Sequence, residues 1–188
     1  SYREVADQYN INYFHEEKNV QDFFKQRLLP HKLSQNGPCL AVGDINGDGA
    51  EDFIVGSSSV YSPKIYTQNS KSTFDSKDLF NSEKDKRYEV ESMTLFDADQ
   101  DGDLDLYLVS GGNEFEAGSD LYNDRLLLND GYGNFTSDPK RVPNLSTNGC
   151  VVRPVDYDLD GDIDLFIGGH NKPGAYPLGE YSYLLKNN

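Results

Sequence analysis

Short apolar runs bounded by polar turns recur along the chain from residue 39 onward. Two runs flank each of three acidic stretches, and their short length and their β-branched and aromatic residues favour strands over helices. The expected strand pairs are CLAV (39–42) with FIVG (53–56), MTLF (93–96) with LYLV (106–109), and VVRPV (151–155) with LFIGG (165–169). The repeating pattern is therefore strand, acidic loop, strand.

A third strand is expected after each pair, and a fourth strand after the first two. The third strands are KIYTQN (64–69), DRLLLND (124–130) and SYLLKNN (182–188). In the first two units a turn and a last short strand follow, at SKSTF (70–74) and GYGNF (131–135), where the Gly-Asn pair marks a tight hairpin. The acidic stretches begin 53 and 59 residues apart, and a period of this length with about four strands is typical of a β-propeller blade. We predict an all-β fold of about three four-stranded, propeller-type units, the last of them incomplete.

The predicted units occupy residues 36–87, 88–145 and 146–188, behind a lead-in segment over residues 1–35. The lead-in pattern indicates a helical turn or an irregular segment before Pro30. The Ser- and Lys-rich stretch 70–87 and the segment 113–123 are expected to be surface loops.

The three acidic stretches share the pattern D-x-[DN]-x-D-G-x-x-D, at residues 44–52, 97–105 and 156–164. Oxygen ligands at positions 1, 3 and 5 converge on one point when a glycine at position 6 turns the backbone, and a main-chain carbonyl at position 7 joins them. The pattern therefore predicts up to three Ca²⁺ sites, closed by the aspartate at position 9. The expected ligands are Asp44, Asn46, Asp48, Ala50 and Asp52; Asp97, Asp99, Asp101, Asp103 and Asp105; and Asp156, Asp158, Asp160, Asp162 and Asp164, with carbonyl oxygens at Ala50, Asp103 and Asp162.

An EF-hand and a zinc site fit these stretches less well than a short calcium loop. An EF-hand needs a bidentate glutamate at position 12, where this chain has Val55, Leu108 and Ile167. Zinc is disfavoured because the pattern offers hard oxygens and no cysteine or histidine. Plain acidic turns remain the alternative, since Asp-Gly turns are common in hairpins. Loop one, with an Asn in place of one carboxylate, is expected to be the weakest site.

The distribution of charge reinforces this interpretation. The chain carries 17 Lys and Arg against 32 Asp and Glu, a net charge of −15. A surface of that sign repels phosphate backbones, so nucleic acid is not expected as a partner. The three acidic stretches hold 14 of the acidic residues and no basic one. No apolar run is longer than four residues, so membrane insertion is not expected either.

The triple motif over residues 36–188 resembles the FG-GAP, or VCBS, repeat of integrin-α-like β-propellers. The lead-in SYREVADQYNINYFHEE is also similar to the segment that precedes such repeats in bacterial proteins like cartilage acidic protein, which often carry an ASPIC/UnbV region. The resemblance implies structural Ca²⁺, an extracellular or cell-envelope location, and adhesion or ligand binding. In place of the Phe-Gly-Gly-Ala-Pro signature the chain has Phe53 to Gly56, Ser110 to Gly112 and Phe166 to Gly169, so the match rests on the calcium loops.

Propellers of this family close with about seven blades, whereas three acidic loops occur here. The sequence is therefore interpreted as a fragment of a larger protein, or as an assembly completed by self-association through open sheet edges. The expected function is a calcium-binding extracellular scaffold that binds a protein or glycan ligand without catalysis. Two alternatives stay open: the propeller or carbohydrate-binding part of an envelope polysaccharide-processing enzyme, and a purely architectural dimer element.

Few residues outside the loops suggest chemistry. Cys39 and Cys150 are expected to be buried free thiols. The histidines His15, His31 and His170 have no matching nucleophile and are interpreted as surface or loop residues. Glu114 and Glu116, beside a Gly-Gly pair, are the best unassigned carboxylates for acid–base work, and solvation in a loop is the expected state of both.

Overall fold

The structure is a computed structural model that describes all 188 residues. Eleven strands form three antiparallel sheets in which each strand pairs with its neighbour in sequence. The first sheet contains β1 (Leu40–Gly43), β2 (Asp52–Val55), β3 (Lys64–Gln68) and β4 (Phe74–Asp78); the second contains β5 (Val90–Phe96), β6 (Asp105–Ser110), β7 (Arg125–Leu128) and β8 (Thr136–Ser137); the third contains β9 (Gly149–Val155), β10 (Asp164–Gly169) and β11 (Tyr183–Leu185). The predicted all-β blade architecture, with a third unit one strand short, is confirmed.

The fourth strands lie further along the chain than predicted. Residues 70–73 and 131–135 form the turns, and the strands that follow are β4 and β8. The tight turn expected at the Gly-Asn pair is present, but the strands begin only at Phe74 and Thr136. The stretch 70–87, expected as a surface loop, contains β4. At 113–123 the chain is irregular except for the short 3₁₀ turn Asp120–Tyr122.

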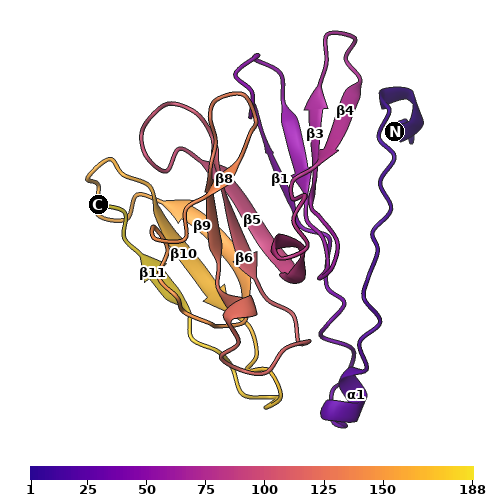
Figure 1. Cartoon of the computed structure of the whole chain (residues 1–188), viewed down its shortest axis with the longest axis vertical. Helices are drawn as coiled ribbons and strands as arrows, with labels where there is room; N and C mark the ends of the chain where they lie inside the picture. The colour runs from indigo at the N-terminus through magenta and orange to yellow at the C-terminus, as the bar shows by residue number, and fades with distance from the viewer.

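The three sheets stack face to face (Figure 1). Every side chain of β6 is buried, because the strand lies in the middle sheet and its alternate residues face opposite neighbours. Leu106 and Leu108 pack in a core shared with the first sheet, whereas Tyr107 and Val109 pack in a core shared with the third. The first strands β1, β5 and β9 are neighbours from sheet to sheet, as the inner strands of propeller blades are.

The outer faces of the stack leave apolar side chains exposed. Leu40 and Val42 on β1 are 57% and 56% exposed. On the third sheet Phe166 and Leu184 are also exposed, at 43% and 50%. Each outer sheet therefore presents a partly apolar face of the kind that the middle sheet buries on both sides.

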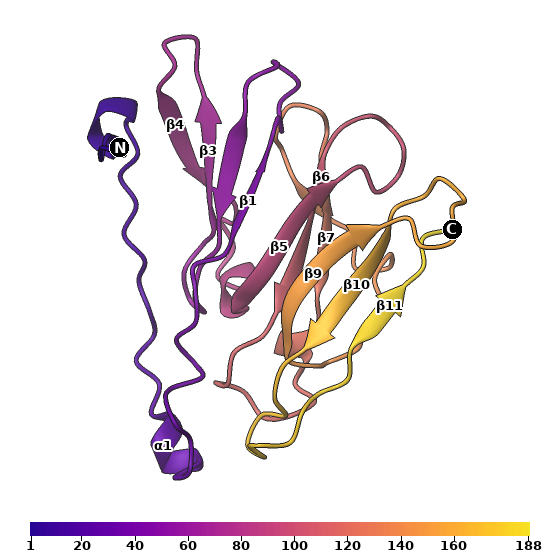
Figure 2. The ribbon, with the colours of Figure 1, turned by 180° about the vertical axis from the view of Figure 1, so that it is seen from behind.

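The lead-in segment runs beside the first sheet as an extended chain, seen from both sides in Figures 1 and 2. Its regular structure is limited to the 3₁₀ turn Ala6–Tyr9 and the single helical turn α1 (Asp22–Lys25). Outside the lead-in, another 3₁₀ turn, Asp85–Arg87, precedes β5. Side chains anchor the lead-in: the Tyr66 hydroxyl donates to the Asn12 carbonyl (3.1 Å), and the Ser58 hydroxyl donates to the Glu16 carbonyl (2.7 Å).

Candidate metal centres

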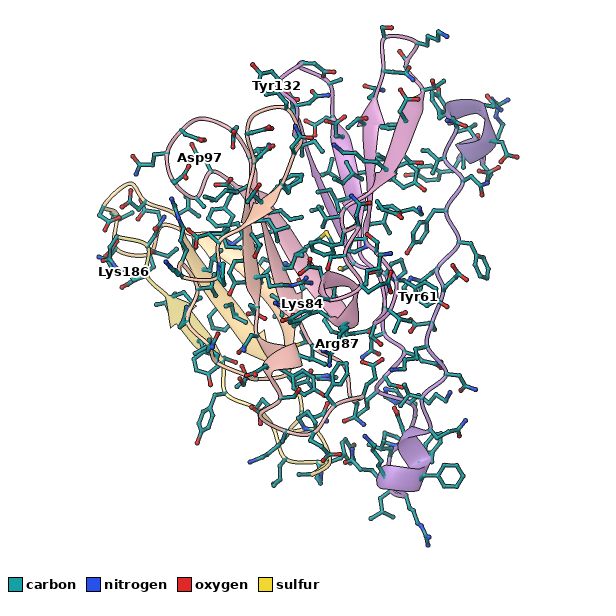
Figure 3. The ribbon with its side chains drawn as sticks, in the orientation of Figure 1. Tyr61, Lys84, Arg87, Asp97, Tyr132 and Lys186 are labelled. Carbon is teal, nitrogen blue, oxygen red and sulfur yellow. The ribbon has the colours of Figure 1, made fainter.

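The three acidic loops lie at the same end of the stack and occupy equivalent places in their sheets. Each joins the first strand to the second, and the last pair of each ladder brackets it: Gly43 with Asp52, Phe96 with Asp105, and Val155 with Asp164. In Figure 3, Asp97 of loop two and Lys186 beside loop three lie at this end. The register places the position-9 aspartate at the start of the second strand, directly under the loop.

The glycine at position 6 of each loop has a positive φ, as the turn requires. The angles are +85° at Gly49, +95° at Gly102 and +98° at Gly161, and a Cβ at any of them would meet no atom within 4 Å. Backbone conformation, rather than space, therefore favours glycine at this position.

The position-9 aspartates are buried, and both of their oxygens accept backbone N–H groups. In loop two, Asp105 Oδ2 accepts from Ala98 N (2.9 Å) and Oδ1 accepts from Asn129 N (2.8 Å). In loop one, Asp52 accepts hydrogen bonds from the backbone N–H groups of Ile45 and Gln68. In loop three, Asp164 accepts them from Tyr157 and Asn187. Burial raises the pKa of Asp52 and of Asp105. These residues thus tie loop, second strand and third strand together, a role that the ligand pattern alone did not reveal.

Two of the three loops gather carboxylates closely enough to hold a cation. One oxygen each from Asp97, Asp99 and Asp105 lies within 4.8 Å of the others, and Asp156, Asp158 and Asp164 form the same group in loop three. The position-5 residues Asp101 and Asp160 are outside these groups. Each instead accepts the backbone N–H at position 7, from Asp103 (3.2 Å) and Asp162 (3.1 Å).

Unpartnered oxygens distinguish loops two and three from loop one. Asp97 Oδ1 and Asp156 Oδ1, both at position 1, are buried without a hydrogen-bond donor. In loop one, Asp44 Oδ1 accepts from Gly47 N (2.8 Å) and Asp48 N (3.1 Å). Desolvation of Asp44 is outweighed by these and the other backbone N–H donors of the loop, which hold its pKa below the usual value. The free carboxylate oxygens of loops two and three therefore suit a hard cation such as Ca²⁺ as ligands. In loop one, backbone N–H groups of the loop already bond the Asp44 carboxylate.

Protein charges partly neutralise the two loops. In loop three Lys186 Nζ pairs with Asp158 and lies 3.1 Å from Asp160; these bonds raise the pKa of Lys186. In loop two Arg141 lies 3.3 Å from Asp99. Burial, with repulsion from Asp101, raises the pKa of Asp103 to about 6. A bound divalent ion would replace these partial counter-charges.

Asparagines link loops one and two each to the following sheet. Asn129 Nδ2 donates to the carbonyls of Ile45 (2.8 Å) in loop one and Leu104 (3.1 Å) in loop two, while Asn129 Oδ1 accepts from Gly133 N (3.0 Å). The next asparagine in the repeat, Asn187, donates to the Ala98 carbonyl of loop two (3.0 Å). The sequence contains a signal for these contacts, because an asparagine comes after the third strand in the second and in the third unit.

We expect Asn129→Ala to lower the free energy of unfolding by about 2–4 kcal/mol, because several buried backbone groups lose their partner. Urea denaturation measures the change. Asn134→Ala is the matched control: Asn134 is exposed and its amide bonds only Asp130, so its effect is expected to stay within about 0.5 kcal/mol. Equal effects of the two substitutions would contradict this role of Asn129.

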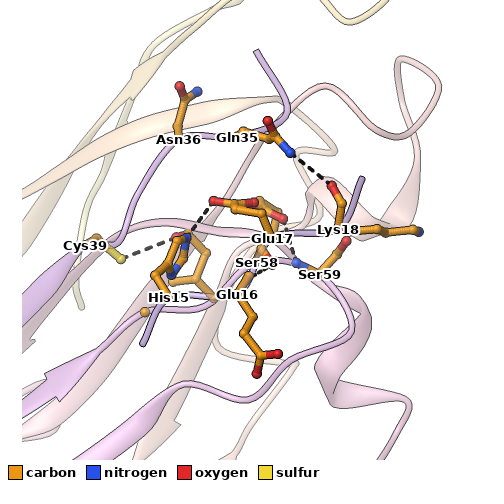
Figure 4. A network of polar contacts seen from close by, with 12 residues as sticks. His15, Glu16, Glu17, Lys18, Gln35, Asn36, Cys39, Ser58 and Ser59 are labelled. Atoms are coloured by element: carbon orange, nitrogen blue, oxygen red, sulfur yellow. Dashed lines mark hydrogen bonds and ion pairs between the residues drawn. The ribbon is translucent and has the colours of Figure 1, made fainter. Parts of the chain in front are cut away.

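A second acidic group lies at the opposite end of the blades and was not predicted from the sequence. We call Glu17, Glu89, Glu91 and Glu114 the glutamate cluster. The expectation that Glu114 is solvated was wrong: its Oε1 accepts from the Ser59 hydroxyl (2.8 Å) and its Oε2 is buried. Glu116 is solvated, with a side chain 89% exposed. His15 lies in the irregular lead-in, in agreement with the expectation of a loop residue, and its side chain is 18% exposed and bonds Tyr13 and Glu17 (Figure 4).

Burial dominates the electrostatics of this cluster. It raises the pKa of Glu89 and of Glu114, each in the field of neighbouring carboxylates. Burial also raises the pKa of Glu91 to about 8, with Glu114 and Glu17 adding to the rise. With a pKa of about 8, Glu91 therefore holds its proton at neutral pH.

Stability should fall as the pH rises through this range. The folded state keeps a proton on Glu91 up to about pH 8, whereas the unfolded chain releases it above about pH 4.3. Each such proton costs up to about 1.4 kcal/mol per pH unit. We expect Glu91→Gln to flatten the pH dependence of urea unfolding in EDTA between about pH 5 and 8, compared with the exposed control Glu116→Gln. Parallel curves for the two variants would show that Glu91 is ionised in the folded protein.

Stacked antiparallel sheets of four, four and three strands, each with an acidic loop after its first strand, define a repeat protein of the β-propeller type. The FG-GAP-like repeat family matches residues 44–108 and 97–167, and each match begins at the first aspartate of an acidic loop. The chain belongs to this FG-GAP-like repeat family. Among curated proteins, none matches it in sequence.

None of its helices has the length and apolar character that a bilayer-spanning segment requires. Cys39 and Cys150 are free thiols as expected, but both are half-buried rather than buried.

Proposed function

We propose that this chain is a calcium-binding, propeller-type scaffold of an exported protein, which binds a protein or glycan ligand and catalyses no reaction. The observation that carries the proposal is the repeated geometry of loops two and three. In each, three aspartate oxygens converge and the position-1 aspartate keeps a buried oxygen without a donor. Oxygen-only sites of this kind suit Ca²⁺.

The role proposed for the metal is structural. Converging carboxylates repel one another when no cation lies between them, and the loops join the first two strands of each sheet. Ca²⁺ in a loop would hold the ends of those strands together and, through the asparagine ties, fix the loop against the next sheet. Weak Ca²⁺ sites fill where the ion is at millimolar concentration, which agrees with the extracellular or envelope location proposed for the chain.

Binding without turnover is the experimental mark of the scaffold. The chain would be tested on arrays of neutral and anionic polysaccharides in Ca²⁺ and in EDTA, with reducing ends and unsaturated products measured in parallel. We expect Ca²⁺-dependent retention without product. Product formation that is lost in Glu114→Gln would instead support the alternative, a part of a polysaccharide-processing enzyme.

The buried glutamates favour that enzymatic alternative, and the cavities oppose it. Glu89 and Glu114 are neighbouring carboxyl groups whose pKa values burial raises, as in acid–base pairs. The two main cavities, of about 370 Å³ and 200 Å³, are lined by other residues. Neither cavity therefore provides a substrate site lined by Glu89 or Glu114, which favours the scaffold.

The partner of the outer faces is proposed to be a further sheet, supplied by the parent protein or by a second copy of this chain. The exposed apolar residues of β1 and of the third sheet correspond to positions that the middle sheet buries. Light scattering over a concentration series would separate the two sources. A dimer that dissociates on dilution supports the second copy, and a monomer at all concentrations excludes it.

A further inference from the structure

The larger of the two main cavities, of about 370 Å³, lies between the second and third sheets. Its apolar lining comes from both sheets, with Tyr107 and Leu126 on one side and Leu165 and Leu185 on the other. These four side chains belong to the core that the two sheets share or pack against it. That core is therefore incompletely filled beside β11.

The edge of the third sheet at this cavity is open. β11 pairs with β10 on one side, and no strand lies along its other side. Figures 1 and 2 both show β11 at the outer margin of its sheet. In the second sheet the corresponding strand, β7, is covered by β8. An unpaired strand presents backbone N–H and C=O groups on which a further strand can form.

The segments that follow β7 and β11 begin in the same way. Asn129 N and Asn187 N each donate to the position-9 aspartate of their own unit, both at 2.8 Å. Their Nδ2 groups each donate to the position-2 carbonyl of the preceding loop, that of Ile45 (2.8 Å) and that of Ala98 (3.0 Å). The second unit is therefore a template for what belongs at the open edge of the third.

In both completed units a phenylalanine comes six residues after the residue whose N–H binds the position-9 aspartate. In the second unit it is Phe135, which packs against the core of the first two sheets just before β8. In the first unit it is Phe74, whose ring centroid lies 5.0 Å from that of Phe53. Phe53 directly follows the position-9 aspartate, as Leu165 does in the third unit. The cavity lined by Leu165 is thus the equivalent place for an aromatic ring.

We propose that the open edge of β11 and the cavity beside it bind an extended polypeptide segment that carries an aromatic side chain. The segment pairs with β11 as β8 pairs with β7, and its ring fills the cavity against Leu165 and Tyr107. Main-chain hydrogen bonds supply affinity in this mode of recognition, and the side-chain pocket supplies selectivity. The inference rests on the proposed function, the binding of a protein ligand, and names the class of that ligand and its site.

A polypeptide strand suits the site better than a small molecule or a second copy of the chain. A small apolar molecule fills the cavity but leaves the backbone groups of β11 unpaired. A second copy already holds Phe74 and Phe135 within its own sheets. The occupant is therefore a separate segment of the same type as residues 130–137, with a turn, an aromatic residue and a short strand in that order.

A synthetic peptide with the sequence of residues 129–137 tests the site on the intact chain by fluorescence anisotropy. We expect saturable binding that is at least roughly tenfold weaker for the peptide with Phe135→Ala, because burial of a phenylalanine side chain has an effect of that size. In the protein, Val142→Phe fills the cavity from its lining and should weaken binding at least as much. Leu178→Phe, at an exposed leucine of the third unit, is the matched control and leaves binding unchanged. Equal binding of the two peptides would overturn the proposal.

A tethered version serves if the free peptide binds too weakly to measure, because a short linker gives an effective concentration in the millimolar range. Residues 131–137 are repeated after Asn188, with and without Phe135→Ala in the repeated copy. We expect the copy with phenylalanine to melt roughly 3–10 °C higher than the alanine copy. Amide hydrogens of Tyr183–Leu185 should be protected from exchange in the phenylalanine version. Equal melting temperatures with unprotected β11 amides would contradict the site.

The outcomes separate this site from the calcium scaffold and from a second copy. If both peptide tests fail while Ca²⁺ still raises the melting temperature, the site is removed and the scaffold stands. Dimers of the unmodified chain that Val142→Phe dissociates would assign the site to a second copy and overturn the proposal. Peptide binding to a monomer in EDTA as well as in Ca²⁺ supports it, because the cavity and the edge of β11 do not depend on bound metal.

Discussion

Replacing Asp105 by alanine is expected to lower the free energy of unfolding by about 2–5 kcal/mol, even in EDTA. The side chain is 1% exposed, and its two oxygens accept the backbone N–H groups of Ala98 and Asn129. Alanine leaves both N–H groups buried without an acceptor, and each such group costs about 1–3 kcal/mol. Urea denaturation in EDTA measures the loss without any contribution from bound Ca²⁺.

Asp101→Ala is the matched control for Asp105→Ala. Asp101 lies in the same loop, but its side chain is exposed, so we expect a change within about 0.5 kcal/mol in EDTA. With Ca²⁺ present, both substitutions should reduce the stabilisation by the ion. If Asp105→Ala and Asp101→Ala had equal effects in EDTA, the aspartate at position 9 would be a ligand only and not a structural tie.

Restoring Ca²⁺ to the EDTA-treated protein is expected to raise its melting temperature strongly. A ligand that binds only the folded state at about 100 times its dissociation constant adds about 2.7 kcal/mol per site. In a chain of this size 1 kcal/mol corresponds to about 2–4 °C, so loops two and three together should contribute a shift on the order of 10–20 °C. Thermal unfolding followed by circular dichroism gives the value.

The loops should differ in their contribution to that shift. Asp99→Ala and Asp158→Ala each remove a carboxylate from a converging group and should each reduce the shift by about half. Asp48→Ala should reduce it less, because loop one already satisfies Asp44 with backbone donors. The same shift in Mg²⁺ as in Ca²⁺ would contradict the assignment, since Mg²⁺ demands a stricter geometry and keeps several waters.

The repeat could be predicted well from the sequence because its signals are local. Short apolar runs and a glycine turn determine strands and loops within a few residues of one another, and both were found where expected. The sequence did not indicate that position 4 of loops two and three is left-handed as well. Gln100 and Leu159 have a φ of +62° there, a conformation that neither residue type favours by itself.

The features that the sequence did not predict depend on contacts between distant segments. The turn and fourth strand of the second unit were expected within residues 131–135, whereas pairing with β7 begins at Thr136. Glu89 and Glu114 are 25 residues apart in the chain and meet only when β5 and β6 pair. Periodicity carries no information about such a meeting, so the glutamate cluster became visible in the structure alone.

Anomalous scattering recorded at long wavelength from crystals grown with Ca²⁺ would locate the ion in the acidic loops. We expect anomalous peaks within loops two and three, bounded by Asp97, Asp99 and Asp105 and by Asp156, Asp158 and Asp164, with Lys186 displaced from Asp158. Loops that keep their lysine and arginine contacts and show no peak at saturating Ca²⁺ would contradict this expectation, because the acidic repeats would then be turns and not metal sites.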